Sequence, residues 1–303
     1  MPDPNSPDGP KGIHVLPFAE TGHIRNQHRD MRYAELSPFQ TLDLYVPDDA
    51  APAGGWPIVI FIHGGAWMMC DKRDIQLGGP LSLLGRGYAV ASINYRLSSE
   101  AVFPAQIHDV KAAIRCLKAR AGELGIDGGR LAVWGASAGA HLASLAGTST
   151  GVPLLEDRSL GWADQNSSVR AVVSFFGPTD FLMMDSYLGE TGAGVPDHSA
   201  ADSPESKLLG AQITEIPALV RAADPQTWLT RSVPPFFFAH APRDPIVPVQ
   251  HSVVFAARIT AVAGVGRARL RFVEGAGHAG PEFDDAGLLA EVADFLDTTL
   301  AVS

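Results

Sequence analysis

The residues with the clearest chemical potential are a serine and the small residues around it. Residues 135–139 read Gly-Ala-Ser-Ala-Gly, which matches G-x-S-x-G, between an apolar segment and an alanine-rich one. A serine on a strand-to-helix turn has a strained backbone, and larger neighbouring side chains would collide there. Short Gly/Ser patterns also arise by chance in a chain with 31 glycines. The pattern predicts that Ser137 is a nucleophile, provided that other residues complete a site.

A second group of small residues lies earlier in the chain. Residues 63–67 read His-Gly-Gly-Ala-Trp and directly follow the apolar segment Ile58 to Ile62. Glycines let the backbone turn its N–H groups outward, where they can hold a developing oxyanion. An ordinary glycine-rich turn between a strand and a helix is the alternative. An oxyanion turn followed by a nucleophile elbow is the order expected of an acyl-transfer enzyme.

A nucleophilic serine also needs a base and an acid. In hydrolases with an α/β sheet, the chain order is Ser, then Asp or Glu, then His. Asp244 follows the apolar segment Phe236 to Ala239, at the strand end where open parallel sheets bind their ligands. His278 lies among glycines and alanines that leave its ring little to pack against. We therefore predict the triad Ser137, Asp244 and His278. A turn-capping role for Asp244 is the alternative, and Asp180, one strand earlier, is expected to be structural.

Four other histidines lie close to these segments. His63 precedes the oxyanion turn and His141 lies one helical turn after the serine, so both are expected to brace the site. His240 and His251 flank the acid loop. Surface positions are the default expectation for this pair, with contact to the triad as the alternative.

Composition and charge exclude several classes of function. The chain has 303 residues, 46% of them hydrophobic, and a formal net charge of −10, which repels nucleic acid and anionic lipid. No run approaches the roughly 18 apolar residues of a membrane span, and residues 1–10 do not resemble a secretory signal. Cys70 and Cys116 are expected to be reduced thiols. We expect a cytoplasmic protein with a small-molecule partner, no nucleic-acid or membrane partner, and neither metal nor organic cofactor.

The apolar segments predict the fold. Short continuous apolar runs are typical of parallel strands covered by helices on both faces, whereas the alternating segment Thr41 to Val46 indicates a half-exposed antiparallel strand. Amphipathic helices are predicted over Ala105 to Ala121 and Leu288 to Leu300. Strands alternating with helices indicate an α/β fold. The six apolar runs are Ile58 to Ile62, Tyr88 to Ile93, Leu131 to Trp134, Ala171 to Phe176, Phe236 to Ala239 and Leu270 to Val273.

The domain organisation is predicted to be simple. Residues 1–30 are expected to be flexible or loosely packed, and residues 31–303 to form one domain. The segment Met183 to Leu229 breaks the strand–helix rhythm and is expected to cover the active site with loops and short helices. The polar segment before the first strand is too short to build a large N-terminal cap.

Taken together, these motifs resemble the hormone-sensitive-lipase-like branch of the α/β-hydrolases. They are more similar still to its small feruloyl-esterase-like carboxylesterases, the BD-FAE type. The resemblance covers the chain from about Leu42 onward. It includes four further segments: 91–97 (Ala-Ser-Ile-Asn-Tyr-Arg-Leu), 103–106 (Phe-Pro-Ala-Gln), 177–180 (Gly-Pro-Thr-Asp) and 244–248 (Asp-Pro-Ile-Val-Pro).

The resemblance implies an α/β-hydrolase fold, with a mostly parallel sheet of about eight strands, and assigns the oxyanion donors. These are the N–H groups of Gly65, Ala66 and Ala138. Many relatives have a third glycine where Ala66 stands, and the lipase-like branch usually has an aspartate where Ala136 stands. Ala136 thus points to the feruloyl-esterase-like subgroup. Trp67 is a tentative pocket residue, with buried packing as the alternative.

The function expected from these residues is hydrolysis of carboxylic esters through an acyl-enzyme. The substrates would be small or short-chain esters, with aryl and feruloyl esters among the candidates. An arylformamidase-like amide hydrolase is the enzymatic alternative, and a non-catalytic binding protein of the same fold is a second one. The oligomeric state is open, with a homodimer among the alternatives.

Overall fold

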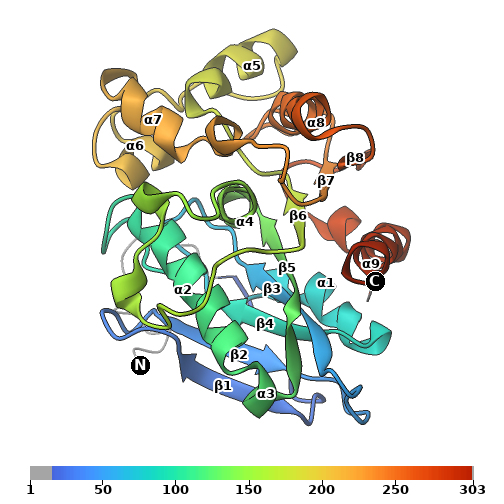
Figure 1. Cartoon of the computed structure of the whole chain (residues 1–303). Helices are drawn as coiled ribbons and strands as arrows, with labels where there is room; N and C mark the ends of the chain where they lie inside the picture. The colour runs from blue at the N-terminus through green and yellow to red at the C-terminus, as the bar shows by residue number, and fades with distance from the viewer. Residues whose placement is uncertain (1–15, 302–303) are drawn as a thin grey trace.

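A computed structural model describes residues 16–301, and within them an eight-stranded sheet forms the centre of the molecule (Figure 1). The strand order is β1-β2-β4-β3-β5-β6-β7-β8, in which β1 and β2 are antiparallel to their neighbours and the other pairs are parallel. The mostly parallel sheet predicted from the apolar runs is confirmed. The strands are β1 (Gln27–Arg32), β2 (Thr41–Tyr45), β3 (Trp56–Ile62), β4 (Ala89–Ile93), β5 (Ile126–Ala136), β6 (Ala171–Phe175), β7 (Phe236–His240) and β8 (Ala268–Phe272).

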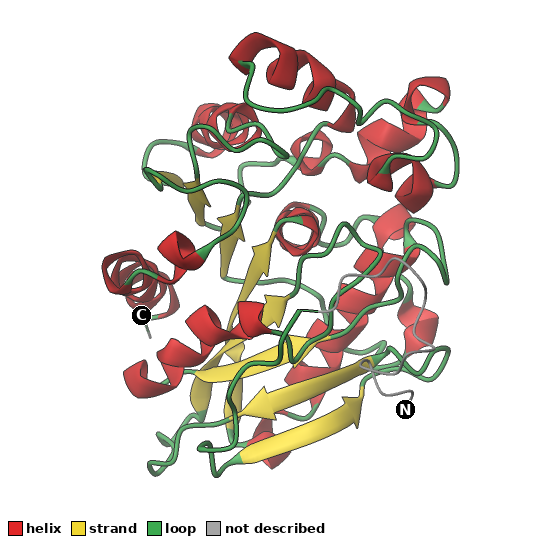
Figure 2. Ribbon diagram, turned by 180° about the vertical axis from the view of Figure 1, so that it is seen from behind, coloured by secondary structure: helices red, strands yellow, loops and turns green. Residues whose placement is uncertain are grey.

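Helices cover both faces of the sheet, as Figure 2 shows from behind. One face packs against α2, α4 and α8, and the other against α1 and α9. None of the helices within residues 16–301 is long and apolar enough to cross a bilayer. Their bounds are α1 (Gly78–Leu81), α2 (Ala105–Ala119), α3 (Ala121–Leu124), α4 (Ala138–Thr148), α5 (Met184–Thr191), α6 (Pro204–Leu209), α7 (Pro217–Ala223), α8 (Gln250–Ala263) and α9 (Ala286–Leu300).

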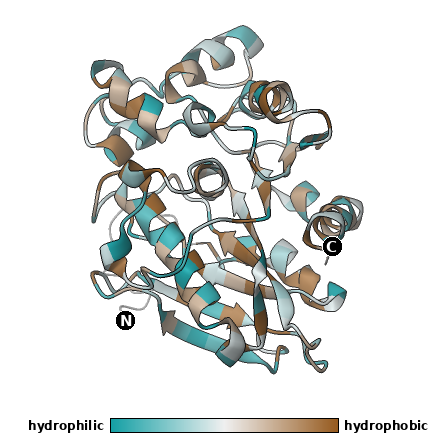
Figure 3. Ribbon diagram, viewed as in Figure 1, coloured by the Kyte–Doolittle hydropathy of each residue, from teal (hydrophilic) through white to brown (hydrophobic). Residues whose placement is uncertain are grey.

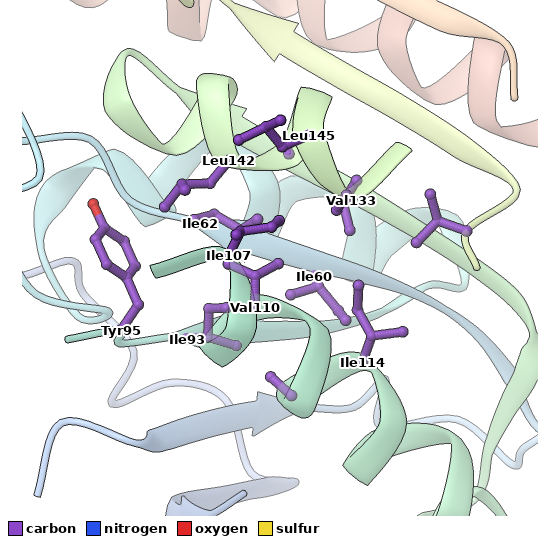
Figure 4. Close-up of a cluster of buried hydrophobic side chains, with 14 of the residues drawn as sticks. Ile60, Ile62, Ile93, Tyr95, Ile107, Val110, Ile114, Val133, Leu142 and Leu145 are labelled. Atoms are coloured by element: carbon purple, nitrogen blue, oxygen red, sulfur yellow. The ribbon is translucent and has the colours of Figure 1, made fainter. Parts of the chain in front are cut away.

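The central strands are apolar throughout because each of their faces is buried. In β3, Ile60 and Ile62 pack toward α2 and α4, where Figure 4 shows them beside Ile107 and Leu142. The alternate residue Phe61 packs on the opposite side with the residues of α9. Hydropathy in Figure 3 follows this arrangement, with the apolar residues concentrated on the strands and the inner sides of the helices. This double burial fixes the strand ends that carry the site.

The first two strands differ from the prediction. β1 is mostly exposed and polar, so it lacks the apolar pattern that would have identified it. The expected boundary between residues 30 and 31 falls inside β1, and the amide of Ala19 already donates to the carbonyl of Arg73 at 2.8 Å. Residues 1–15 of the expected flexible segment lie outside the described residues. β2 is fully buried, and its expected half-exposure is wrong because Asp43 pairs with Arg73 inside the protein.

The segment between β6 and β7 contains the short helices α5, α6 and α7, which Figure 1 shows grouped together beyond α4. It contacts the rest of the fold at two points near the predicted triad. The carbonyl of Ala223 lies 2.8 Å from Nε2 of His141, and a Cβ on Gly194 would lie 1.8 Å from the carbonyl oxygen of Pro245. The segment therefore adjoins both the helix after Ser137 and the acid loop, and its role as a cover stays a prediction.

Candidate active site

Ser137 lies on a tight turn between β5 and α4. Its backbone has φ 52° and ψ −120°, a conformation that is strained for a residue with a side chain. A Cβ on Gly135 would lie 2.1 Å from the carbonyl oxygen of Gly139, and one on Gly139 would lie 2.0 Å from that of Ile62. The turn therefore requires both glycines, for the steric reason that the sequence pattern suggests.

The structure brings the three predicted triad residues together. Oγ of Ser137 lies 3.0 Å from Nε2 of His278, and Nδ1 of His278 lies 2.8 Å from Oδ2 of Asp244. Asp244 is buried, whereas the His278 side chain keeps 14% of its surface exposed. The contacts form one continuous line from a buried carboxylate to a serine hydroxyl.

The surroundings of Asp244 favour its charged form. Oδ1 accepts hydrogen bonds from the amides of Ile246 and Val247, both at 2.9 Å. Burial raises the pKa of the Asp244 carboxyl, but its contacts with His240 and His278 outweigh burial and hold the pKa well below its usual range. An ionised Asp244 accepts the Nδ1 proton of His278, which leaves Nε2 free to accept a proton from Ser137.

The oxyanion turn follows β3 and faces the same region. Gly65 and Ala66 have φ values of 96° and 53°, and the carbonyl of Gly65 accepts hydrogen bonds from the amides of Met68 and Met69. Among the described residues, none accepts a hydrogen bond from the amides of Gly65, Ala66 or Ala138. These three N–H groups, assigned by resemblance as oxyanion donors, are thus available to an external acceptor.

Trp67 is buried, with 2% of its surface exposed. Its ring packs at steep angles against His141 and Phe181, with centroids 5.3 and 5.4 Å away. The tentative assignment of Trp67 to a pocket wall stays a prediction. The alternative, buried packing next to the oxyanion turn, describes the ring.

The flanking histidines divide into two groups. His63 stacks on Tyr95, and His141 binds the carbonyl of Ala223, so both brace the neighbourhood of the site as expected. Burial lowers the pKa of His141 to about 4. His240 and His251 are fully buried, so the default expectation of surface positions is wrong. His251 contacts Thr179, 72 residues earlier, whereas the polar contacts of His240 lie within 12 residues. The burial of His240 follows from how β7, the acid loop and α8 pack together, which the sequence does not show.

Sequence reasoning missed Gln76, whose side chain holds the start of the oxyanion turn. Its Oε1 accepts the amide proton of Gly64 at 2.9 Å, and its Nε2 donates to Asp74 at 3.2 Å. The Asp-x-Gln spacing could have indicated a capped turn, but not its contact with Gly64. Asp180 caps the turn that begins at Phe181, with its carboxylate 3.2 Å from the amide of Leu182, as expected for a structural aspartate.

The part of the chain that the structure describes contains no group of three or more His, Cys, Asp or Glu side chains arranged to hold a metal ion. The chemistry that this site can offer is that of the hydroxyl, the imidazole, the carboxylate and the three free amides.

Residues 42–259 match the family model described as BD-FAE. The chain belongs to the BD-FAE family. Two curated relatives come from Mycobacterium tuberculosis: esterase LipQ, 31% identical over 87% of this chain, and esterase LipC, 33% identical over 84%. The chain spans 59% of the length of LipQ and 60% of that of LipC.

Solved structures resemble this BD-FAE chain along most of its length. A truncated carbohydrate esterase from gut microbiota is 29% identical, with a TM-score of 0.82, covering 93% of this chain and 99% of that one. A bifunctional GH43-CE protein from Bacteroides eggerthii is 31% identical, with a TM-score of 0.79, over 91% of this chain and 35% of that one. Together with the sheet topology, these likenesses establish the α/β-hydrolase fold.

Proposed function

We propose that this BD-FAE protein is a serine carboxylesterase. The observation that carries the proposal is the line from Ser137 through His278 to Asp244, with contacts of 3.0 and 2.8 Å. A nucleophile within hydrogen-bond reach of a base, itself oriented by a third group, is the arrangement that acyl-transfer chemistry requires.

The proposed reaction has two halves. Oγ of Ser137 attacks the ester carbonyl as His278 takes its proton, and Asp244 stabilises the resulting imidazolium. The N–H groups of Gly65, Ala66 and Ala138 hold the oxyanion, and His278 returns the proton to the departing alcohol. A water molecule, deprotonated by His278, then attacks the acyl-enzyme. The bond between the acyl carbon and Oγ breaks, His278 passes the proton to Oγ of Ser137, and the carboxylic acid leaves.

The relatives support ester hydrolysis. LipQ and LipC are named esterases, and this chain aligns with them over more than four-fifths of its length. Non-catalytic proteins of this fold usually lack a member of the triad, whereas all three side chains are in contact here. Both points favour an enzyme over a binding protein.

We further propose small or short-chain esters as substrates, with acylated sugars and feruloyl esters included in the first tests. The similarity to a carbohydrate esterase and to a GH43-CE protein motivates this choice. A panel of acetyl, butyryl, octanoyl and feruloyl esters, with an acetylated xyloside, would rank the acyl and alcohol preferences by kcat/KM.

The first experiment compares two serine variants with 4-nitrophenyl acetate as substrate. Ser137→Ala should lower kcat by roughly 10⁶, since removal of a triad nucleophile has this effect in serine hydrolases. Ser144→Ala, a buried serine on the same helix α4, is the matched control and should retain activity. Near-normal hydrolysis by Ser137→Ala would refute the proposal.

The amide alternative needs its own measurement, because the same triad can cleave either bond. Hydrolysis of N-formylkynurenine is to be compared with that of the ester panel. We expect the best ester to have the higher kcat/KM, and the reverse ranking would favour an arylformamidase-like enzyme.

A further inference from the structure

His240 is a fully buried histidine at the end of β7, four residues before the acid of the triad. Its Nε2 lies 2.8 Å from the carbonyl oxygen of Val247 and 3.5 Å from Oδ2 of Asp244. Its Nδ1 lies 2.7 Å from Oγ of Ser252 on α8. The ring thus connects the strand, the acid loop and the following helix.

The neighbours of His240 determine where its proton resides. Both groups near Nε2, the Val247 carbonyl and the Asp244 carboxylate, can only accept hydrogen bonds, so Nε2 carries the proton. In the neutral ring Nδ1 is then the acceptor, and the hydroxyl of Ser252 donates to it. The order Ser252, His240, Asp244, His278, Ser137 therefore forms a five-member line of polar contacts.

The two oxygens of Asp244 are held differently. Oδ1 accepts the amides of Ile246 and Val247, which lie in the same loop and would move with it. Oδ2, the oxygen that contacts His278, also faces His240, whose ring is anchored on β7 and α8. His240 is thus the contact that relates the reactive oxygen to the sheet rather than to the loop alone.

We propose that His240 is a positioning residue that holds the acid loop and the reactive oxygen of Asp244 in place for His278. This inference rests on the proposed function, because it concerns the same triad. His240 also polarises Oδ2, so its loss changes both the orientation of the carboxylate and the charge available to His278.

Three variants test this role. His240→Phe keeps a buried ring but removes both nitrogens, His240→Gln retains an N–H near the position of Nε2, and Ser252→Ala removes only the hydroxyl that binds Nδ1. For His240→Phe we expect kcat to fall about 10- to 100-fold with KM within about threefold, the loss expected when a catalytic group is displaced by a fraction of an ångström to 1 Å. His240→Gln should recover most of that loss, and Ser252→Ala should lower kcat several-fold.

The pH profile separates positioning from a loss of folded protein. In His240→Phe the negative charge of Asp244 no longer interacts with a second imidazole and acts on His278 alone. The acid limb of the kcat/KM profile should therefore move to higher pH. A change in the amount of folded enzyme would scale the profile without moving it. Wild-type kcat and an unmoved acid limb in His240→Phe, or equal losses in His240→Gln and His240→Phe, would overturn the proposal. If His240→Phe does not fold, unchanged kcat and pH profile in Ser252→Ala would overturn it.

A spectroscopic readout keeps this inference distinct from the proposed function. The proton between Nδ1 of His278 and Asp244 is followed by proton NMR in the wild type and in His240→Phe, and its resonance should move. A wild type inactive toward every ester would refute the carboxylesterase, while the NMR comparison would still test the contact. An unmoved resonance would overturn the role of His240 even if the esterase is confirmed.

Discussion

The two halves of the candidate site are held in place by different means. Ser137 and the oxyanion turn follow β5 and β3, central strands that are buried over the ends leading to the site, and their geometry depends on glycines packed against backbone atoms. Asp244 and His278 follow β7 and the largely exposed edge strand β8, and side-chain hydrogen bonds hold them.

The two halves of the site should therefore respond differently to amino-acid substitution. In the nucleophile half the backbone atoms are already in contact, so an added methyl group should clash with them and destabilise the fold. The half that carries Asp244 and His278 is held by hydrogen bonds, and one partner can be removed while the fold is kept. Substitutions there should lower the rate of catalysis rather than the stability of the fold.

Within the half that carries Asp244 and His278, Asp244→Asn should lower turnover strongly. The amide cannot accept the Nδ1 proton and stabilise the imidazolium as a carboxylate does, and kcat should fall by about 10⁴. Steady-state hydrolysis of a nitrophenyl ester measures this. Asp180→Asn is the matched control, since Asp180 caps a turn after the neighbouring strand β6, and it should retain kcat within about threefold. Equal losses in both variants would contradict the assignment of the acid.

Gly139→Ala should have a large effect on folding. Its methyl group would lie 2.0 Å from the carbonyl oxygen of Ile62, and we expect a loss of about 3 kcal/mol or more in the free energy of unfolding in urea. Gly122→Ala in α3 is the control, because no atom lies within 4 Å of the added Cβ. A Gly139→Ala protein as stable as the wild type would break the contrast between the two halves.

Acid should weaken the fold through its buried histidines. Burial lowers the pKa of His141 to about 4, whereas an unfolded histidine titrates near 6.5. As pH falls from about 6.5 to 4, the unfolded chain takes up the proton first, so stability is lost across this window. His141 alone should account for about 2 kcal/mol between pH 7.5 and pH 5.

Urea unfolding at these two pH values, in the wild type and in His141→Phe, measures the contribution. The pH-dependent loss should shrink in His141→Phe and persist in His28→Gln, whose histidine is exposed on β1. An identical pH dependence in all three proteins would show that His141 is not its source.

Substitutions on the edge strand should have the smallest effect. Arg271 on β8 pairs with Glu291 at 3.2 Å, with half of each side chain exposed, and Arg271→Gln should change the free energy of unfolding by less than about 1 kcal/mol. Ile60→Ala on the buried strand β3 should cost about 2–5 kcal/mol in the same urea titration. Similar losses in both variants would contradict the difference between centre and edge.

The sequence predicted the nucleophile half best because close backbone contacts there leave room only for glycine, and glycine is visible in the sequence. Gly135 is required by a contact within the turn, with the carbonyl of Gly139, whereas Gly139 is required by the carbonyl of Ile62 on β3. Both requirements are nevertheless visible as one five-residue pattern. The apolar runs likewise placed the strands β3 to β8 close to their observed positions. The expected cover on both faces is wrong for β8, which is largely exposed because it lies at the edge of the sheet. Strand β1 escaped detection because an exposed edge strand needs no apolar pattern.

The supporting contacts could not be predicted, because they join side chains of different elements, and the packing of these elements decides which side chains meet. His240 faces Asp244 on the next loop, but its second contact is with Ser252 on α8. Gln76 reaches back to Gly64, and Asp43 on β2 is buried only because Arg73 pairs with it. The residue type alone does not show whether a polar side chain is buried or exposed, whereas the folded structure does.

The sheet order has a consequence for how the chain acquires its chemistry. The reacting groups follow β3, β5, β7 and β8. Ser137 has its base only after His278, which lies 141 residues later in the chain, has come into contact with it. Contacts of such long range form late in folding, because the intervening chain must be ordered first. During synthesis Ser137 is made 141 residues before His278, so the serine has no base until the edge strand β8 has docked on the sheet.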